Sequence, residues 1–92
     1  MAWQDIYYLE KSENYVIYHC KEKRILTRQT LTNAHHLFPN YICRIHKTYA
    51  VSLLHITHIK RDSLQVREKE LPISRSYRDA FRKSFEAFNR KK

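Results

Sequence analysis

Apolar and polar side chains alternate with a period of two through most of the first 70 residues, and this alternation restricts the chain to a mainly β fold. Tyr, Val and Ile, which pack well on a pleated surface, are frequent in these segments. Short polar turns, as at residues 11–14 and 21–23, separate the segments and favour antiparallel hairpins. The pattern predicts strands at residues 6–9, 15–20, 24–28, 41–45, 50–53, 56–59, 64–66 and 71–73.

Two segments follow the period of a helix instead. After Thr30, the side chains of Leu31, Ala34, Leu37 and Phe38 fall on one helical face, which predicts a short mid-chain helix of about two turns with Thr30 as its N-cap.

The second helical segment is the C-terminal one, where aromatic side chains recur on one face at Tyr77, Phe81, Phe85 and Phe88. This spacing predicts an amphipathic helix docked on the sheet core. Ser76 and Asp79 have the spacing of a capping-box variant, so we expect the helix to start within a residue of Ser76. Residues 89–92 are expected to form a basic tail.

The chain contains no glycine, which excludes the phosphate-cradling loops of nucleotide-dependent enzymes and leaves the turns to Asn, Asp, Ser and charged residues. Its 92 residues allow one domain, 1–92. Lys and Arg number 18 against nine acidic residues, a net charge of +9, of which +8 follows Cys43. This basic excess predicts a polyanionic partner.

No apolar run is long enough to cross a bilayer and no secretory signal opens the chain, so we expect a cytoplasmic protein with no membrane association. Cys20 and Cys43 are expected to remain unbridged in that reducing compartment. The six histidines lack the converging spacing of metal ligands, so neither a metal nor another cofactor is expected. A small basic chain of this kind also fits a metal-independent ribonuclease, with His46 or Tyr49 as acid–base groups.

Basic residues meet polar turns in three places, residues 11–14, 44–48 and 74–78. Cations near phosphates supply affinity for nucleic acid, and side chains that reach base edges supply specificity. Taken together, the three segments favour a binding module over an enzyme.

The same segments resemble a known family. The run Arg44-Ile45-His46-Lys47-Thr48-Tyr49, the run Pro72-Ile73-Ser74-Arg75-Ser76-Tyr77 and the hairpin Asn14-Tyr15-Val16 are similar to motifs of the LytTR family of bacterial DNA-binding domains. The resemblance extends from about Trp3 to Phe88.

This resemblance implies a β sandwich of three packed antiparallel sheets with little helix, which reads double-stranded DNA through loops in the major groove. Family members are typically output domains of response regulators in two-component systems, and they regulate transcription from direct-repeat promoter sites that a second copy can share. The implied base-contacting positions are Asn14, Lys47 and Ser76. The full predicted DNA-binding set is Ser12, Asn14, Arg44, His46, Lys47, Arg75, Ser76 and Arg78, with further phosphate anchors at Lys60, Arg61, Arg82 and Lys83.

The sequence departs from the family pattern at three points. Position 76 is commonly basic in the family but holds serine here, so Arg75 or Arg78 is expected to supply the cation. Ser52 stands where asparagine is usual, a change expected to affect a turn hydrogen bond. The resemblance also implies one or two further strands before the position of Ile6, and we expect these to be missing here. A regulator that binds a partner transcription factor is the remaining alternative.

Overall fold

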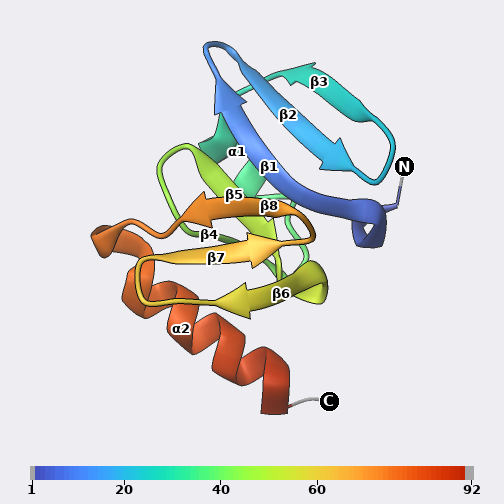
Figure 1. Ribbon diagram of the computed structural model, residues 1–92. Helices are drawn as coiled ribbons and strands as arrows, with labels where there is room; N and C mark the ends of the chain where they lie inside the picture. Colours follow the sequence, from blue (N-terminus) through green and yellow to red (C-terminus); the bar gives the residue numbers. More distant parts are fainter. Residues whose placement is uncertain (1, 91–92) are drawn as a thin grey trace.

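The computed structural model describes residues 2–90 and is mostly β, with strands in two antiparallel sheets and a long C-terminal helix (Figure 1). In chain order its elements are η1 (Trp3–Asp5), β1 (Ile6–Ser12), β2 (Tyr15–Cys20), β3 (Arg24–Arg28), α1 (Leu31–His35), β4 (Ile42–Arg44), β5 (Tyr49–Ser52), η2 (Leu53–His55), β6 (Ile56–Ile59), β7 (Ser63–Val66), β8 (Lys69–Pro72) and α2 (Arg75–Arg90). Here η marks a 3-10 turn.

The first sheet has the strand order β3-β2-β1-β5-β4 and the second the order β6-β7-β8. The expected mainly β class is confirmed, but the described residues form two sheets and not three. The reason is that β1 pairs on both sides: Leu9 lies opposite Tyr18 of β2 and opposite Ala50 of β5. One continuous strand therefore joins the two pairs of strands into a single sheet.

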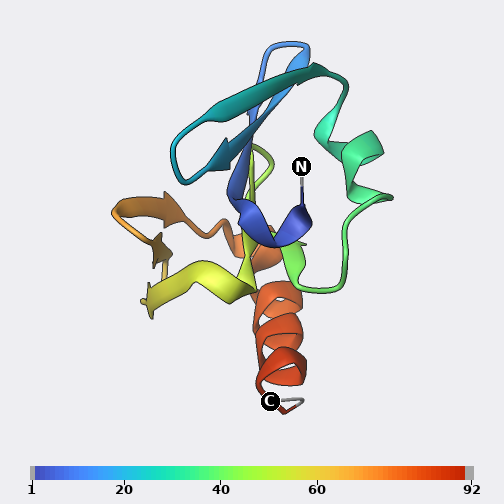
Figure 2. The ribbon, with the colours of Figure 1, turned by 90° about the vertical axis from the view of Figure 1, so that its right-hand side faces the viewer.

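Successive residues of β1 point to opposite faces of this sheet and divide the core in two. Tyr8 belongs to the core cluster that includes buried residues of the second sheet and Phe81 of α2, whereas Leu9 belongs to the cluster that includes Val16 and Leu31 of α1. Figure 2 shows the second sheet and α1 on opposite sides of the first sheet. The first sheet is thus covered on both faces at β1 and β5, whereas no residue of β3 is buried.

The turns form without glycine, as expected. The β1–β2 and β7–β8 hairpins have two-residue loops, and the first loop residue has a positive φ in both: 53° at Glu13 and 57° at Arg67. The left-handed region is unfavourable for residues that carry a Cβ atom. The first strand also runs further than predicted, to Ser12, because its ladder with β2 continues to the Ser12–Tyr15 pair.

The mid-chain helix is shorter than the expected two turns. Its N-cap is confirmed, since the Thr30 hydroxyl accepts a hydrogen bond from the Asn33 amide at 3.0 Å. Beyond His35 the backbone continues in 3-10-like turns, with Phe38 N–H donating to the His35 carbonyl. Leu37 lies in this stretch and is exposed, so it does not extend the apolar face.

The C-terminal helix starts at Arg75, within a residue of Ser76 as predicted, but Ser76 lies in its first turn and is not the cap. Asn89 and Arg90 belong to the helix, so the expected basic tail over 89–92 does not include them; Lys91 and Lys92 lie outside the described residues. Phe81 anchors the helix in the core. No described helix has the length and apolarity needed to span a membrane.

Candidate nucleic-acid interface

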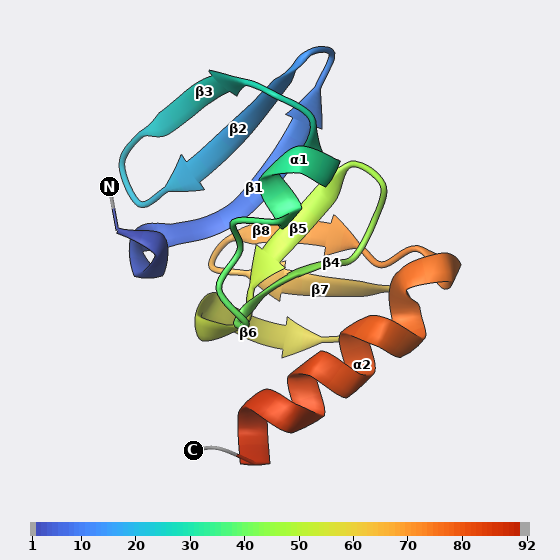
Figure 3. The same cartoon turned by 180° about the vertical axis from the view of Figure 1, so that it is seen from behind.

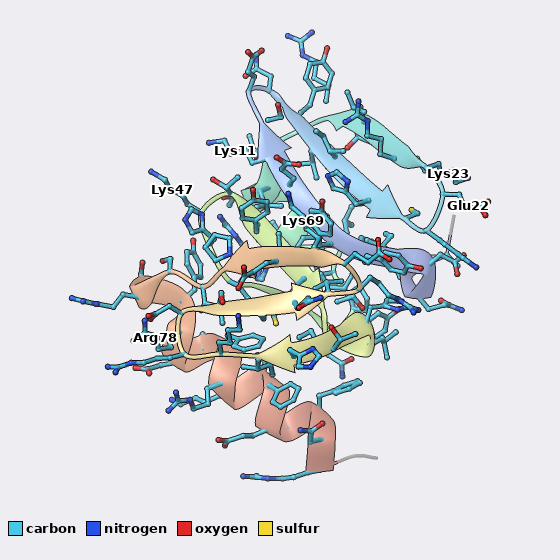
Figure 4. The ribbon with its side chains drawn as sticks, in the orientation of Figure 1. Lys11, Glu22, Lys23, Lys47, Lys69 and Arg78 are labelled. Carbon is cyan, nitrogen blue, oxygen red and sulfur yellow. The ribbon has the colours of Figure 1, made fainter. Side chains whose placement is uncertain are left out.

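Three loops meet along one edge of the molecule: the β1–β2 turn, the β4–β5 loop and the connection from β8 to α2. Backbone hydrogen bonds join the β4–β5 loop to the end of β1, just before the β1–β2 turn, and to the connection from β8 to α2. Lys11 N–H donates to the Thr48 carbonyl at 2.7 Å, and Ser74 N–H donates to the Ile45 carbonyl at 2.8 Å. Figure 4 shows the side chains of Lys11 and Lys47 extending from the same edge. The three segments singled out in the sequence are therefore neighbours in space.

The middle loop is a tight turn closed by its own backbone. The Tyr49 carbonyl accepts from the amides of Ile45 and His46, and Tyr49 N–H donates back to His46 O at 3.1 Å. The Thr48 amide donates to His46 Nδ1 at 3.1 Å. A neutral His46 therefore carries its proton on Nε2, and Nε2 remains as a donor. Lys47, at the tip of the turn, is exposed.

The Arg44 side chain connects this loop to helix α2. Its Nη2 donates to the Lys47 carbonyl at 3.0 Å, and its guanidinium lies 5.2 Å from the centroid of the Tyr77 ring in α2. Its Nε is buried and has no hydrogen-bond partner among the described residues. These contacts make Arg44 a residue that positions Lys47.

The β1–β2 turn carries Asn14, whose side chain is the carboxamide of the predicted DNA-binding set. Ser12 ends β1, Glu13 takes the left-handed conformation, and Asn14 follows; all three side chains are exposed. Because the hairpin is pinned by the Ser12–Tyr15 pair, the position of Asn14 relative to the sheet is fixed.

At the start of α2, the predicted residues have different surroundings. Arg75 and Ser76 are exposed, and the hydroxyls of Ser74 and Ser76 lie 3.0 Å apart. Arg78 instead donates from Nη2 to Asp62 Oδ1, and its side chain is only 24% exposed. Of the two cations considered as replacements at position 76, Arg75 is therefore the accessible one.

A hollow of about 460 Å³ on this edge brings three cations together, with Lys11, Arg44 and Lys47 facing the first turn of α1. Among the described residues that line it, none is acidic. Lys11 was absent from the predicted set, although it stands in the first of the three basic segments. Its position beside a turn was the feature of the sequence that could have indicated Lys11. Lys11 comes close to Lys47 because β1 pairs with β5.

The four residues that the sequence predicts as further phosphate anchors have different surroundings. Lys60 Nζ lies 3.4 Å from Glu70 Oε2, and the hydroxyl of Ser63 donates to the same oxygen at 2.9 Å. These two hydrogen bonds hold the pKa of Glu70 below its usual value. Arg61, Arg82 and Lys83 are exposed and form no ion pair with an acidic side chain of residues 2–90.

Two of the histidines outside this edge make polar contacts within the fold. His19 Nε2 lies 2.9 Å from Glu10 Oε1, and His55 Nε2 lies 2.7 Å from the Gln4 carbonyl. No group of three or more His, Cys, Asp or Glu side chains among residues 2–90 could hold a metal ion. Cys43 is a free thiol, as expected.

Ser52 departs from the family pattern and has a local role. It is fully buried and caps η2, with its hydroxyl accepting a hydrogen bond from the Leu54 amide at 3.3 Å. The side chain at this position therefore maintains a turn hydrogen bond, and it lies away from the loop edge.

Two antiparallel sheets, a docked C-terminal helix and an edge of basic and amide side chains define a small nucleic-acid-binding domain. The chain belongs to the LytTr DNA-binding domain family, whose model matches residues 1–86. This is a family of DNA-binding output domains of response regulators, not of catalysts, so DNA binding in transcription regulation is supported over the ribonuclease alternative.

The fold is similar to that of a LytTr DNA-binding domain of a response regulator from Bacillus cereus. The TM-score is 0.85 at 24% sequence identity, and the match covers 91% of this chain and 84% of that one. This likeness establishes the fold. Among curated proteins, no match to the sequence was found.

Proposed function

We propose that this domain binds double-stranded DNA sequence-specifically, with its three joined loops entering the major groove at promoter sites. The observation that carries the proposal is the pair of backbone hydrogen bonds, Lys11 to Thr48 and Ser74 to Ile45, which fixes the loops relative to one another. Loops that are already fixed can enter the major groove without the loss of conformational entropy that ordering them on binding would require.

The base contacts are assigned by chemistry and exposure. The Asn14 carboxamide suits the N6 and N7 edge of adenine, and the Lys47 ammonium suits O6 and N7 of guanine. At the third position the Ser76 hydroxyl reaches a base or phosphate oxygen, and Arg75 supplies the cation. His46 contributes its Nε2 donor beside Lys47.

Phosphate contacts supply most of the affinity. Lys11 lies in the cationic hollow, and Arg61, Arg82 and Lys83 are exposed beyond it. Arg44 and Arg78 act by holding the loops, because both guanidiniums are bound within the protein. With about five or six phosphates engaged, the logarithm of affinity falls with the logarithm of salt concentration with a slope near −5.

The target is a direct-repeat promoter site that two copies of the domain occupy, one on each repeat. The domain thereby supplies the DNA-reading output of a transcriptional regulator.

The test compares two variants on a cognate duplex and a scrambled duplex of equal length. Lys47→Ala is expected to weaken binding to the cognate duplex by about 5- to 150-fold, the equivalent of roughly 1–3 kcal/mol, with little change on the scrambled duplex. Lys83→Ala is expected to weaken both duplexes alike. Fluorescence anisotropy at fixed salt measures all four affinities. If both variants lose the same factor on both duplexes, the assignment of Lys47 to base reading is wrong.

A further inference from the structure

A groove lies between α1 and α2, across β4, on the face of the molecule seen in Figure 3. Its volume is about 310 Å³, at the lower end of the size of small-molecule sites. The side chains that line it include His35 and His36 of the α1 end, Cys43 and Arg44 of β4, and Tyr77 and Ala80 of α2. Because β4 is the last strand of its sheet, no neighbouring strand among the described residues covers this side.

The groove combines apolar walls with one cationic group. Cys43, Tyr77 and Ala80 supply the walls, and burial raises the pKa of the Cys43 thiol to about 12, so this wall stays neutral. Arg44 supplies the cation, and its buried Nε has no hydrogen-bond partner among the described residues. A buried N–H group without a partner is unfavourable, and a shift of the guanidinium toward the groove would give this atom an acceptor.

The charge pattern selects an anion. None of the described residues that line the groove is acidic, so Arg44 has no carboxylate competitor there. The guanidinium lies over the Tyr77 ring, which leaves the edge of its plane for hydrogen bonding. The small Ala80 side chain leaves space for a flat apolar body beside Tyr77. The two imidazoles add further donors at the α1 side.

We propose that this groove binds a small aromatic carboxylate, whose carboxylate pairs with the Arg44 guanidinium and whose rings lie against Cys43, Tyr77 and Ala80. Carboxylates are the preferred planar partners of a guanidinium. The apolar rings replace water on the walls of the groove.

Binding at this groove acts on the DNA-reading edge. Arg44 is shared: its Nη2 holds the Lys47 carbonyl, while its Nε faces no protein partner. A carboxylate that draws the guanidinium toward the groove competes with that carbonyl and loosens the Lys47 loop. The ligand therefore weakens DNA binding, and by linkage DNA weakens the ligand. This coupling rests on the proposed function; the groove itself does not.

Binding is tested with 2-naphthoate, followed by nuclear magnetic resonance of the ¹⁵N-labelled chain, with 2-naphthalenemethanol as the uncharged analogue. We expect saturable shifts at the amides of Cys43, Arg44 and Ala80, and at least tenfold weaker binding of the alcohol. Shifts that do not saturate, or equal affinity for acid and alcohol, overturn the site.

Two variants of α2 test the location. Ala80→Leu fills the groove and is expected to weaken 2-naphthoate at least tenfold. Ala87→Leu makes the same change two turns further along the same helix face, at an exposed position outside the groove, and leaves the affinity unchanged. Arg44→Met, confirmed as folded by its melting curve, lowers the affinity for 2-naphthoate to that for the alcohol. Equal affinities of the Leu variants overturn the placement.

The coupling is tested by DNA anisotropy with the groove saturated. We expect 2-naphthoate to raise the Kd for DNA at least threefold in the unmodified chain and in Ala87→Leu, and to leave it unchanged in Ala80→Leu. An unchanged Kd in the saturated, unmodified chain overturns the coupling. If the chain binds no DNA even without 2-naphthoate, the proposed function fails and the titration alone decides the groove.

Discussion

Replacing Arg44 by methionine separates a positioning role from a phosphate contact. The change removes the hydrogen bond to the Lys47 carbonyl, with a net value of about 1.5–3 kcal/mol for a charged donor. It also removes the contact with the Tyr77 ring, worth about 0.5–1 kcal/mol at a partly exposed site. Loss of the unpartnered Nε–H offsets roughly 1 kcal/mol of this. The expected net loss is about 1–3 kcal/mol of unfolding free energy, a fall in Tm of roughly 4–24 °C for a domain of this size.

Thermal unfolding followed by circular dichroism measures this loss, and anisotropy over a range of salt concentrations measures the phosphate contribution. A positioning residue leaves the slope of log affinity against log salt unchanged in Arg44→Met, although the affinity itself falls. The matched variant Lys11→Gln is expected to reduce the magnitude of that slope by about 0.9, one phosphate contact. An unchanged Tm together with a slope reduced by about 0.9 in Arg44→Met would refute the reasoning and make Arg44 a phosphate anchor.

Three further predictions follow from single contacts. Glu13→Gly relieves a left-handed φ of 53° and is expected to raise stability by about 0.5–1 kcal/mol after the entropy cost of glycine, measured by urea denaturation; a loss of stability would contradict it. Lys11→Gln is expected to weaken cognate and scrambled duplexes equally, whereas a loss confined to the cognate duplex would place Lys11 at a base. Burial raises the pKa of the Cys43 thiol from 9.0 to about 12, so with rising pH this thiol ionises in the unfolded chain before it ionises in the folded one. The contribution of the neutral Cys43 thiol to the free energy of unfolding is therefore fully present below pH 9 and is lost as the pH rises to 12. Comparing the alkaline unfolding of Cys43→Ala with that of the unmodified chain isolates this effect, and identical pH dependence would disprove it.

Local pattern was sufficient for most elements of the fold. Strand β2 and strand β3 have the predicted bounds, and the Thr30 cap was identified from one residue and the apolar face that follows it. These features depend on neighbours within a few positions of the chain. The bounds of a strand differ from the predicted ones where its partner extends the hydrogen-bonded ladder, as at Ser12. The residues of one strand do not by themselves indicate how far it pairs with its neighbour.

The candidate site was also predicted only in part from local sequence. The sequence located the three basic segments and named Asn14, Lys47 and Arg75, which are exposed on the loop edge. It could not separate those residues from Arg44 and Arg78, since all are basic or polar residues in the same segments. Only the folded chain shows that the Arg44 guanidinium is held by the Lys47 carbonyl and the Arg78 guanidinium by Asp62.

The sequence by itself determined the mainly β class, the hairpins without glycine and the basic character of the second half, because each follows from side-chain period or charge within a short stretch of chain. The tertiary structure decided which cations are accessible and that the three loops are neighbours. The hydrogen bonds from Lys11 to Thr48 and from Ser74 to Ile45 join residues 37 and 29 positions apart, and no local pattern specifies them. They arise because β1 pairs with β5 and because α2 returns beneath the sheet, so the interface is a product of long-range pairing.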